Sequence, residues 1–361
     1  MTRISRVLIA NRGEIALRVI QACREMNIET VLAVSEADRL SLPAQMADRA
    51  VCIGPPLPSQ SYLKVDTIMA AAIGTGADAI HPGYGFLAEQ PELAKACAKY
   101  DLAFIGPRAA HIKQMGDKIF ARQVAVDSGI SIIPGSELIA DYRQAARFAE
   151  RTGYPILVKA AAGGGGKGMK IVKTPADLRV AFNEASAEAR SAFGDERLYL
   201  EHYVENARHV EIQIFGDGRG NVVHLFERDC SLQRRYQKLV EEAPSVALDS
   251  AMREKICRAA VKIAAQIKYR NAGTVEFIFD RNQAQFYFLE MNTRIQVEHP
   301  VTEQITGIDL VKEQFGVAAG NSLSFGQKDV KLAGHAIECR INAESPENNF
   351  LPSPGKIEQW I

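Results

Sequence analysis

The stretch YPILVKAAAGGGGKGMKIV, residues 154–172, decides how the fold of this chain is interpreted. An apolar strand enters four consecutive glycines, and a second apolar segment returns from them. Glycines lose much conformational entropy on ordering and add nothing to a core, so a bound ligand must compensate for them. Backbone N–H groups closing over phosphate oxygens would do so. The pattern is not a P-loop and no helix follows, so we predict a flap between two strands; a flexible hairpin tip is the alternative.

A hairpin further along the chain carries two carboxylates. Residues 273–292, GTVEFIFDRNQAQFYFLEMN, predict two apolar strands joined by the turn DRNQ, with Glu276 and Glu290 on the two strands. Two buried carboxylates close together repel each other, so a cation is expected between them. With Asn292 they suit a hard cation, Mg²⁺ or Mn²⁺, and Mg²⁺ usually binds together with nucleotide phosphates. Ion pairs with Arg or Lys are the alternative.

The segment EMNTRIQVEHP, residues 290–300, places polar side chains at every second position: Glu290, Asn292, Arg294, Gln296 and Glu298. If the strand stays extended, these side chains point the same way. Arg294 then offers a planar fork to a planar oxyanion, and Glu298 beside it can act as a base. The pattern predicts phosphoryl transfer from ATP to a small oxyacid. A surface strand of alternating polarity is the alternative.

Other basic and polar residues extend this predicted site. Lys159 directly precedes the glycines and is a candidate phosphate clamp, although an edge-strand lysine is the alternative. In ERDCSLQRRYQKLVEEAP, residues 227–244, Gln233 and Lys238 are candidate contacts to ATP and to the oxyanion. A solvated charged edge is the alternative for this segment.

The first hundred residues alternate apolar strands with amphipathic helices, which predicts a doubly wound parallel sheet. Its ligands would bind at the carboxyl ends of the strands, where Asn11–Glu14 and His81–Gly85 lie. No G-x-G-x-x-G follows the first strand, which argues against a dinucleotide site. From about residue 113 the pattern becomes α+β, with antiparallel strand signals and a helix over SAMREKICRAAVKIAAQIKY.

Composition excludes several classes of protein. The 361 residues carry 43 Lys+Arg and 43 Asp+Glu, so no single-sign charge favours a nucleic acid or an anionic membrane as partner. The first apolar run is too short for a signal peptide or a membrane span. Six scattered cysteines form no C-x-x-C pair and predict reduced thiols in a cytoplasmic protein.

Together these motifs resemble the biotin carboxylase family, and the resemblance covers almost the whole chain. The segments that carry it are VLIANRGEIALRV, DAIHPGYGFLAE, GDK, VKAAAGGGGKGM, ERDCSLQRRYQKLVEEAP, EMNTRIQVEHPVTE, GIDLVKEQ, and GHAIECRINAE with FLPSPGKI. The resemblance implies an ATP-grasp fold. It also implies carboxylation of biotin on a biotin carboxyl carrier protein, with ATP and bicarbonate as substrates and carboxyphosphate as intermediate.

The resemblance also implies a role for each matching position. ATP contacts would come from Lys118, Lys159, Gly165, Gly166, Glu201, Val204, His209, Gln233, Tyr236, Glu276 and Glu290. The metal would be held by Glu276, Glu290 and Asn292, and bicarbonate by Lys238, Arg294, Gln296 and Val297. Glu298 would be the general base, and Arg340 would stabilise the charged ureido oxygen of biotin. Tyr236 departs from the family, because many members have histidine there.

Four segments are expected: a doubly wound domain over 1–112, an ATP-grasp region with the flap over 113–203, the rest of that region over 204–330, and the start of a C-terminal domain over 331–361. The family's C-terminal domain continues beyond GKIEQWI, so we expect a C-terminally shortened chain. Carboxyltransferase subunits are the expected partners, with a homodimer at full length and acetyl-CoA as the final acceptor. The alternatives are another ATP-grasp carboxylate–amine ligase and a shortened, non-catalytic ATP-binding module.

Overall fold

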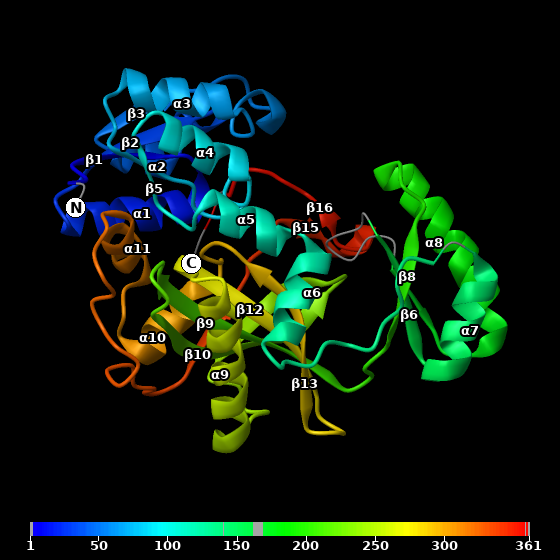
Figure 1. Ribbon diagram of the computed structural model, residues 1–361. Helices are drawn as coiled ribbons and strands as arrows, with labels where there is room; N and C mark the ends of the chain where they lie inside the picture. The colour runs from blue at the N-terminus through cyan, green and yellow to red at the C-terminus, as the bar shows by residue number, and fades with distance from the viewer. Residues whose placement is uncertain (1–2, 140, 162–168, 358, 360–361) are drawn as a thin grey trace.

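The computed structural model describes residues 3–139, 141–161, 169–357 and 359. It places an N-terminal sheet beside a larger central sheet, with a small lid of three strands and two helices standing at one side (Figure 1). The predicted mixture of a doubly wound domain and an α+β region is confirmed.

The N-terminal sheet is parallel, with the strand order β3-β2-β1-β4-β5. Its strands are β1 (Arg6–Ile9), β2 (Glu29–Val34), β3 (Arg49–Cys52), β4 (Ala79–His81) and β5 (Ala103–Phe104). The helices around it are α1 (Gly13–Glu25), α2 (Leu42–Met46), α3 (Val65–Gly74) and α4 (Pro91–Lys99). Two separate cores, one on the α1 face and one on the face of α3 and α4, bury the sheet on both sides as the continuous apolar runs of β1 and β2 require.

The central sheet has the order β13-β12-β9-β10-β11-β14, and its neighbours pair antiparallel. Its strands are β9 (Ala207–Asp217), β10 (Val222–Arg234), β11 (Gln237–Ala243), β12 (Arg270–Asp280), β13 (Gln285–Asn292) and β14 (Ala336–Cys339). The helices that pack on it are α5 (Ala109–Gly116), α6 (Lys118–Asp127), α9 (Ser250–Gln266), α10 (His299–Thr306) and α11 (Leu310–Ala318). Helix α11 lies between α1 and β12, so one core joins the two sheets.

The lid consists of α7 (Tyr142–Thr152), β6 (Ile156–Ala160), β7 (Met169–Val172), α8 (Leu178–Phe193) and β8 (Leu198–His202). Its strands follow the order β7-β6-β8, and α7 and α8 cover the face turned away from the central sheet (Figure 1). A hydrophobic core of its own holds these elements together. Asp141 caps α7, and Gly153 closes it with a positive φ of 80°. The predicted strand and returning strand pair antiparallel as β6 and β7, and the glycines between them lie outside the described residues.

The last segment adds to the central sheet. Strand β14 pairs with β11 as the edge strand, and the backbone N–H of Arg340 continues the ladder to the carbonyl of Leu239. The short strands β15 (Glu344–Ser345) and β16 (Leu351–Pro352) pair with each other. Strands were predicted here, but nothing in the sequence indicated that β14 extends the central sheet. The expected domain boundaries stay predictions.

Sequence reasoning missed several elements of the described chain, among them α2, α5, α10, α11 and β11. It also missed β3 and α8. Strand β3 is an edge strand with mostly exposed side chains, so it lacks the apolar run that marks β1 and β2. Helix α8 is alanine-rich and ends before Gly194, a helix signal that the sequence does contain. None of the described helices is long and apolar enough to cross a membrane.

The packing of β9 against β12 yields a test of the fold. A Cβ added to Gly216 would lie 2.2 Å from the backbone oxygen of Tyr269, so the two strands would have to separate. We expect Gly216→Ala to lower the free energy of unfolding by roughly 1–3 kcal/mol, measured by thermal or denaturant unfolding. Gly74→Ala in α3 is the control, because no atom lies within 4 Å of its added Cβ. Equal stability of the two variants would contradict this packing.

Candidate active site

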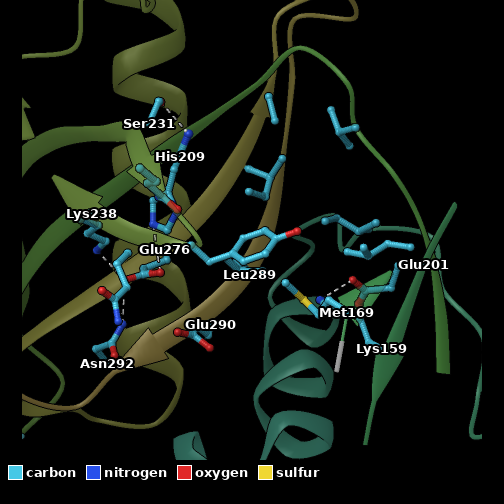
Figure 2. A pocket seen from close by; sticks show the side chains of 18 of the residues that line it. Lys159, Met169, Glu201, His209, Ser231, Lys238, Glu276, Leu289, Glu290 and Asn292 are labelled. Carbon is cyan, nitrogen blue, oxygen red and sulfur yellow. Dashed lines mark hydrogen bonds and ion pairs between the residues drawn. The ribbon is translucent and has the colours of Figure 1, made fainter. Parts of the chain in front are cut away.

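A cavity of about 790 Å³ lies between the lid and the central sheet. Figure 2 shows Lys159, Met169 and Glu201 on its lid side, and His209, Lys238, Glu276, Glu290 and Asn292 on its sheet side. The cavity collects predicted site residues from across the chain: Lys118, Lys159, Glu201, Val204, His209, Gln233, Tyr236, Lys238, Glu276, Glu290, Asn292, Arg294, Gln296, Val297, Glu298 and Arg340. Gly165 and Gly166, the predicted flap contacts, lie outside the described residues.

The predicted carboxylate pair lies on adjacent strands. Glu276 of β12 and Glu290 of β13 are direct cross-strand partners. Lys238 of β11 donates to Glu276 (Nζ–Oε1, 3.0 Å), to Glu298 (Nζ–Oε1, 2.8 Å) and to Glu211. One ammonium group therefore contacts three carboxylates from different elements.

Burial and these contacts shift the pKa values of the two carboxylates and of Lys238. Burial alone would raise the pKa of Glu276, but Lys238 and His209 hold it well below its usual value. Burial raises the pKa of Glu290, and the charge of Glu276 raises it further. Burial alone would lower the pKa of Lys238, yet Glu211 and Glu276 raise it well above its usual value. Glu290 is thus the member of the pair whose negative charge the protein compensates least.

The donor set fits a hard divalent cation. Glu276 and Glu290 supply carboxylate oxygens, and Glu290 points into the cavity (Figure 2). Asn292 follows on the same strand; its Nδ2 donates to Glu276 (2.9 Å), while its Oδ1 keeps a second lone pair beside its bond from Arg294. Oxygen donors of this kind bind Mg²⁺ in proteins.

One geometric prediction was wrong. The strand does not stay extended through Glu298, because β13 ends at Asn292 and the chain bends at 293–294 before turning into α10. Thr293 is buried, and its N–H donates to Glu89 (3.0 Å) on the N-terminal domain. Arg294 and Glu298 still line the cavity, but from the bend and the turn and not from an extended strand.

Glu298 lies between two cations, Lys238 and Arg340. Its Oε2 accepts from Nη2 of Arg340 (2.9 Å), whose Nε donates to Glu241 (2.7 Å). Burial alone would raise the pKa of Glu298, but Lys238 and Arg228 lower it to about 2. Glu298 is therefore ionised at neutral pH, as a proton acceptor must be.

Sequence reasoning missed Arg228, a buried residue that hydrogen-bonds several side chains around the site. It is fully buried, and its guanidinium donates to Glu211, Gln213 (2.7 Å), Thr302 (2.9 Å), Thr274 (3.1 Å) and Gln296 (2.8 Å). These five bonds use all five of its donors. Gln296 in turn donates to Glu276 (3.0 Å), so its amide retains one N–H for a ligand.

Glu211 was missed as well, although the sequence carried a signal for it. His209, Glu211 and Gln213 alternate along β9, as polar residues on one face of an otherwise apolar strand. Nε2 of His209 lies 3.0 Å from Glu276, and Nδ1 lies 3.2 Å from the amide nitrogen of Gln233. The signal that pointed to Glu276 on β12, a charged residue within an apolar strand, thus occurs on β9 as well.

The lid side of the cavity is tied to α6 by ion pairs. Glu201 of β8 accepts from Lys159 of β6 (2.7 Å) and from Arg122 of α6 (2.7 Å). Burial alone would lower the pKa of Lys159, but Glu201 raises it. Lys159 is therefore a cation inside the cavity, and Arg122 links its partner Glu201 to the body of the protein. A contact of Lys159 with phosphate stays a prediction.

Apolar residues from both sides line the same region of the cavity. Met169 comes from the lid, Val204 from the connection after β8, and Leu289 and Ile278 from the central sheet. Tyr236, at the tip of the β10–β11 hairpin, is 52% exposed and lies at the rim. A flat, partly apolar ligand with an anionic tail matches this division between an apolar region and a charged one.

Two family models match the chain. One describes "Biotin carboxylase, N-terminal domain" and matches residues 3–112. The other describes "Carbamoyl-phosphate synthase L chain, ATP binding domain" and matches residues 117–325.

Individual relatives match nearly the whole chain. "Biotin carboxylase 1" of Bacillus subtilis is 54% identical, over 99% of this chain and 80% of its own length. A pyruvate carboxylase subunit of Methanothermobacter thermautotrophicus is 53% identical, over 98% and 72%. A solved structure is also similar: the biotin carboxylase domain dimer of Hydrogenobacter thermophilus 2-oxoglutarate carboxylase, in complex with MgADP, ADP and bicarbonate. Its TM-score is 0.93 and its sequence identity is 48%, over 100% of this chain and 80% of that chain.

The charge of Glu298 yields a pH test. Its folded pKa of about 2 lies below the ordinary 4.5, so its ionised form contributes stability above about pH 4.5 that is lost as the pH falls toward 2. This linkage is on the order of 3 kcal/mol. We expect Glu298→Gln to lower the thermal midpoint at neutral pH, and the difference from wild type to shrink below about pH 4.5.

The exposed Glu92→Gln is the matched control and should leave the midpoint unchanged at either pH, because its side chain is 60% exposed. A difference between wild type and Glu298→Gln that stays constant or grows on acidification would contradict the assigned ion pairs.

Proposed function

The chain belongs to the biotin carboxylase family, and on that premise we propose that it uses ATP and bicarbonate to carboxylate biotin held on a carrier protein. The observation that carries the proposal is the placement of Glu276 and Glu290 within one cavity that also contains Arg294, Glu298 and Arg340. The carboxylate pair would hold the metal ion of a metal–nucleotide complex. Arg294 would bind an oxyanion, Glu298 would accept a proton, and Arg340 would stabilise a second anionic centre.

The nucleotide would bind between the lid and the central sheet. The apolar region around Met169 and Leu289 suits the adenine, and the segment from Glu201 to Val204 would contact its edge. Lys159 and Lys118, both cavity residues, would contact the phosphates, with Gly165 and Gly166 of the predicted flap over them. Mg²⁺ or Mn²⁺ on Glu276, Glu290 and Asn292 would neutralise phosphate charge.

Bicarbonate would bind beside the γ-phosphate. Arg294 and Lys238 supply positive charge, and Gln296 and the backbone of Val297 supply hydrogen-bond donors. Bicarbonate next to Lys238 brings a second negative charge close to Glu298, which raises the pKa of that carboxyl from its low resting value and makes it a stronger base. As a bicarbonate oxygen attacks the γ-phosphorus and ADP leaves, Glu298 takes the bicarbonate proton, and carboxyphosphate forms.

The second step would take place next to Arg340. Carboxyphosphate loses CO₂, the released phosphate removes the proton from N1′ of biotin, and N1′ attacks CO₂. Between the loss of the N1′ proton and the attack on CO₂, the negative charge lies on the ureido oxygen, where a guanidinium stabilises it. Nε and Nη2 of Arg340 are bound to Glu241 and Glu298, an arrangement that fixes the guanidinium at the cavity wall and leaves Nη1 for the ureido oxygen.

The remaining partners are proposed from the family. A biotin carboxyl carrier protein would deliver biotin, carboxyltransferase subunits would use the product, and the protein would form a homodimer. Acetyl-CoA is our proposed final acceptor, although named relatives belong to a pyruvate carboxylase and to a 2-oxoglutarate carboxylase. Depletion of the protein from extracts of its source should abolish acetyl-CoA-dependent fixation of labelled bicarbonate. If only pyruvate-dependent fixation is lost, acetyl-CoA is not the acceptor and pyruvate takes its place.

The proposed reaction has a direct test. With Mg²⁺ and ATP present, we expect ADP release to rise when bicarbonate and free biotin are both added, because both steps then turn over. A coupled assay for ADP measures this rate. If bicarbonate and biotin leave a basal ATPase unchanged in a folded protein, the proposal is wrong. Turnover with an amine in place of bicarbonate would instead favour a carboxylate–amine ligase.

The variant Arg294→Lys distinguishes a role in bicarbonate binding from a role in ATP binding. The variant keeps the positive charge but loses the planar fork, so biotin carboxylation should fall roughly a hundredfold while ATP affinity changes little. Initial rates give the first quantity, and isothermal titration calorimetry with the nucleotide gives the second. Equal losses in both would contradict the oxyanion role of Arg294.

A further inference from the structure

Glu89 belongs to the N-terminal domain but contacts the end of the central-sheet strand that carries the oxyanion site. Its Oε2 accepts from Nε of Arg294 at 2.8 Å. Its Oε1 accepts from the backbone N–H of Thr293 at 3.0 Å and lies 3.5 Å from the hydroxyl of the same residue. Both carboxylate oxygens are therefore directed at the two residues of the bend at 293–294.

The loop after β4 is built to deliver this carboxylate. Gly83 and Gly85 have positive φ values of 63° and 68°, which bend the chain sharply at the carboxyl end of the sheet. The side-chain amide of Asn11 donates to the carbonyl of Pro82 and to that of Tyr84, at 2.7 Å each. Leu87 and Ala88 are buried in the N-terminal domain, so the residue that follows them is held in place.

The ion pair with Glu89 uses one N–H donor of Arg294 and leaves others for a bound oxyanion. Glu89 occupies Nε, while Nη2 donates to Asn292 Oδ1 (3.2 Å) and Nη1 to the carbonyl of Ile295 (3.2 Å). Each terminal nitrogen carries a second hydrogen. Because the guanidinium is planar, an ion pair at Nε fixes the plane in which those hydrogens point into the cavity.

Glu89 is better placed to orient Arg294 than to bind a cation. Its charge contributes to the raised pKa of Glu290, after burial and Glu276, so it lies near the candidate metal residues. Both of its oxygens, however, already accept from the main chain of Thr293 and from Arg294. A metal ligand at this position would have to give up one of these bonds.

We propose that Glu89 is a positioning residue for bicarbonate, which the N-terminal domain contributes to a site otherwise built by the central sheet. It holds Arg294 through Nε so that the two terminal nitrogens face a small planar oxyanion. This inference rests on the proposed function, because bicarbonate is the oxyanion that it assigns to Arg294. It explains why the loop after β4 reaches across the domain boundary.

The experiment compares Glu89→Gln with wild type in the ADP-release assay, with bicarbonate and ATP varied separately. Glutamine keeps an acceptor for the N–H of Thr293 but loses the charge that holds Arg294. We expect kcat/KM for bicarbonate to fall about tenfold, equivalent to about 1.4 kcal/mol, with KM for ATP unchanged. Glu92→Gln, on the neighbouring helix α4 and 60% exposed, is the control and should behave as wild type.

A double variant tests whether the effect passes through Arg294. If it does, Glu89→Gln added to Arg294→Lys should reduce the rate little further, whereas independent effects would multiply. An unchanged bicarbonate dependence, equal losses for both substrates, or a larger requirement for Mg²⁺ alone would overturn the inference while the function stands. A wild-type protein whose ADP release does not depend on bicarbonate would overturn both.

Discussion

Two carboxylates that face each other across one ladder, Glu276 and Glu290, impose the constraint on which the rest of the site depends. Like charges directly opposite on neighbouring strands are destabilising, and burial increases the cost. Lys238 neutralises one side of the pair, and Arg228 below it satisfies Glu211 and the surrounding polar groups with all five of its donors. The charge that remains on the cavity side belongs to Glu290, and we propose that a divalent cation bound with a nucleotide compensates it.

The site is assembled from parts of the fold that are remote in sequence. The central sheet supplies the carboxylates, its edge strand β14 leads into Arg340, and the lid brings Lys159 across the cavity. The N-terminal sheet contributes through the loop after β4, where Glu89 reaches Arg294. Catalysis by positioning and charge neutralisation requires such a rigid arrangement, because a small misplacement of one group lowers the rate strongly.

Much of this arrangement was predictable from the sequence, and the exceptions have physical reasons. Strand–helix order predicted the N-terminal sheet, and two apolar runs around a turn predicted the Glu276–Glu290 hairpin, because strand order and turn chemistry are local properties. The bend after Asn292 was not predictable from alternation, since it depends on a bond from Thr293 to a distant domain. The role of Arg228 was equally hidden, because a charged residue in a charge-rich segment gives no sign of its burial. Strand β3 lacked an apolar run because it lies at an exposed edge.

The most direct test of the account is binding of Mn²⁺ in the presence of ADP, followed by electron paramagnetic resonance. We expect wild-type protein to bind the ion with the nucleotide, and Glu290→Gln to weaken binding of the ion strongly while the protein remains folded. Wild-type affinity for Mn²⁺ in both Glu276→Gln and Glu290→Gln would contradict the claim that this carboxylate pair is the metal site.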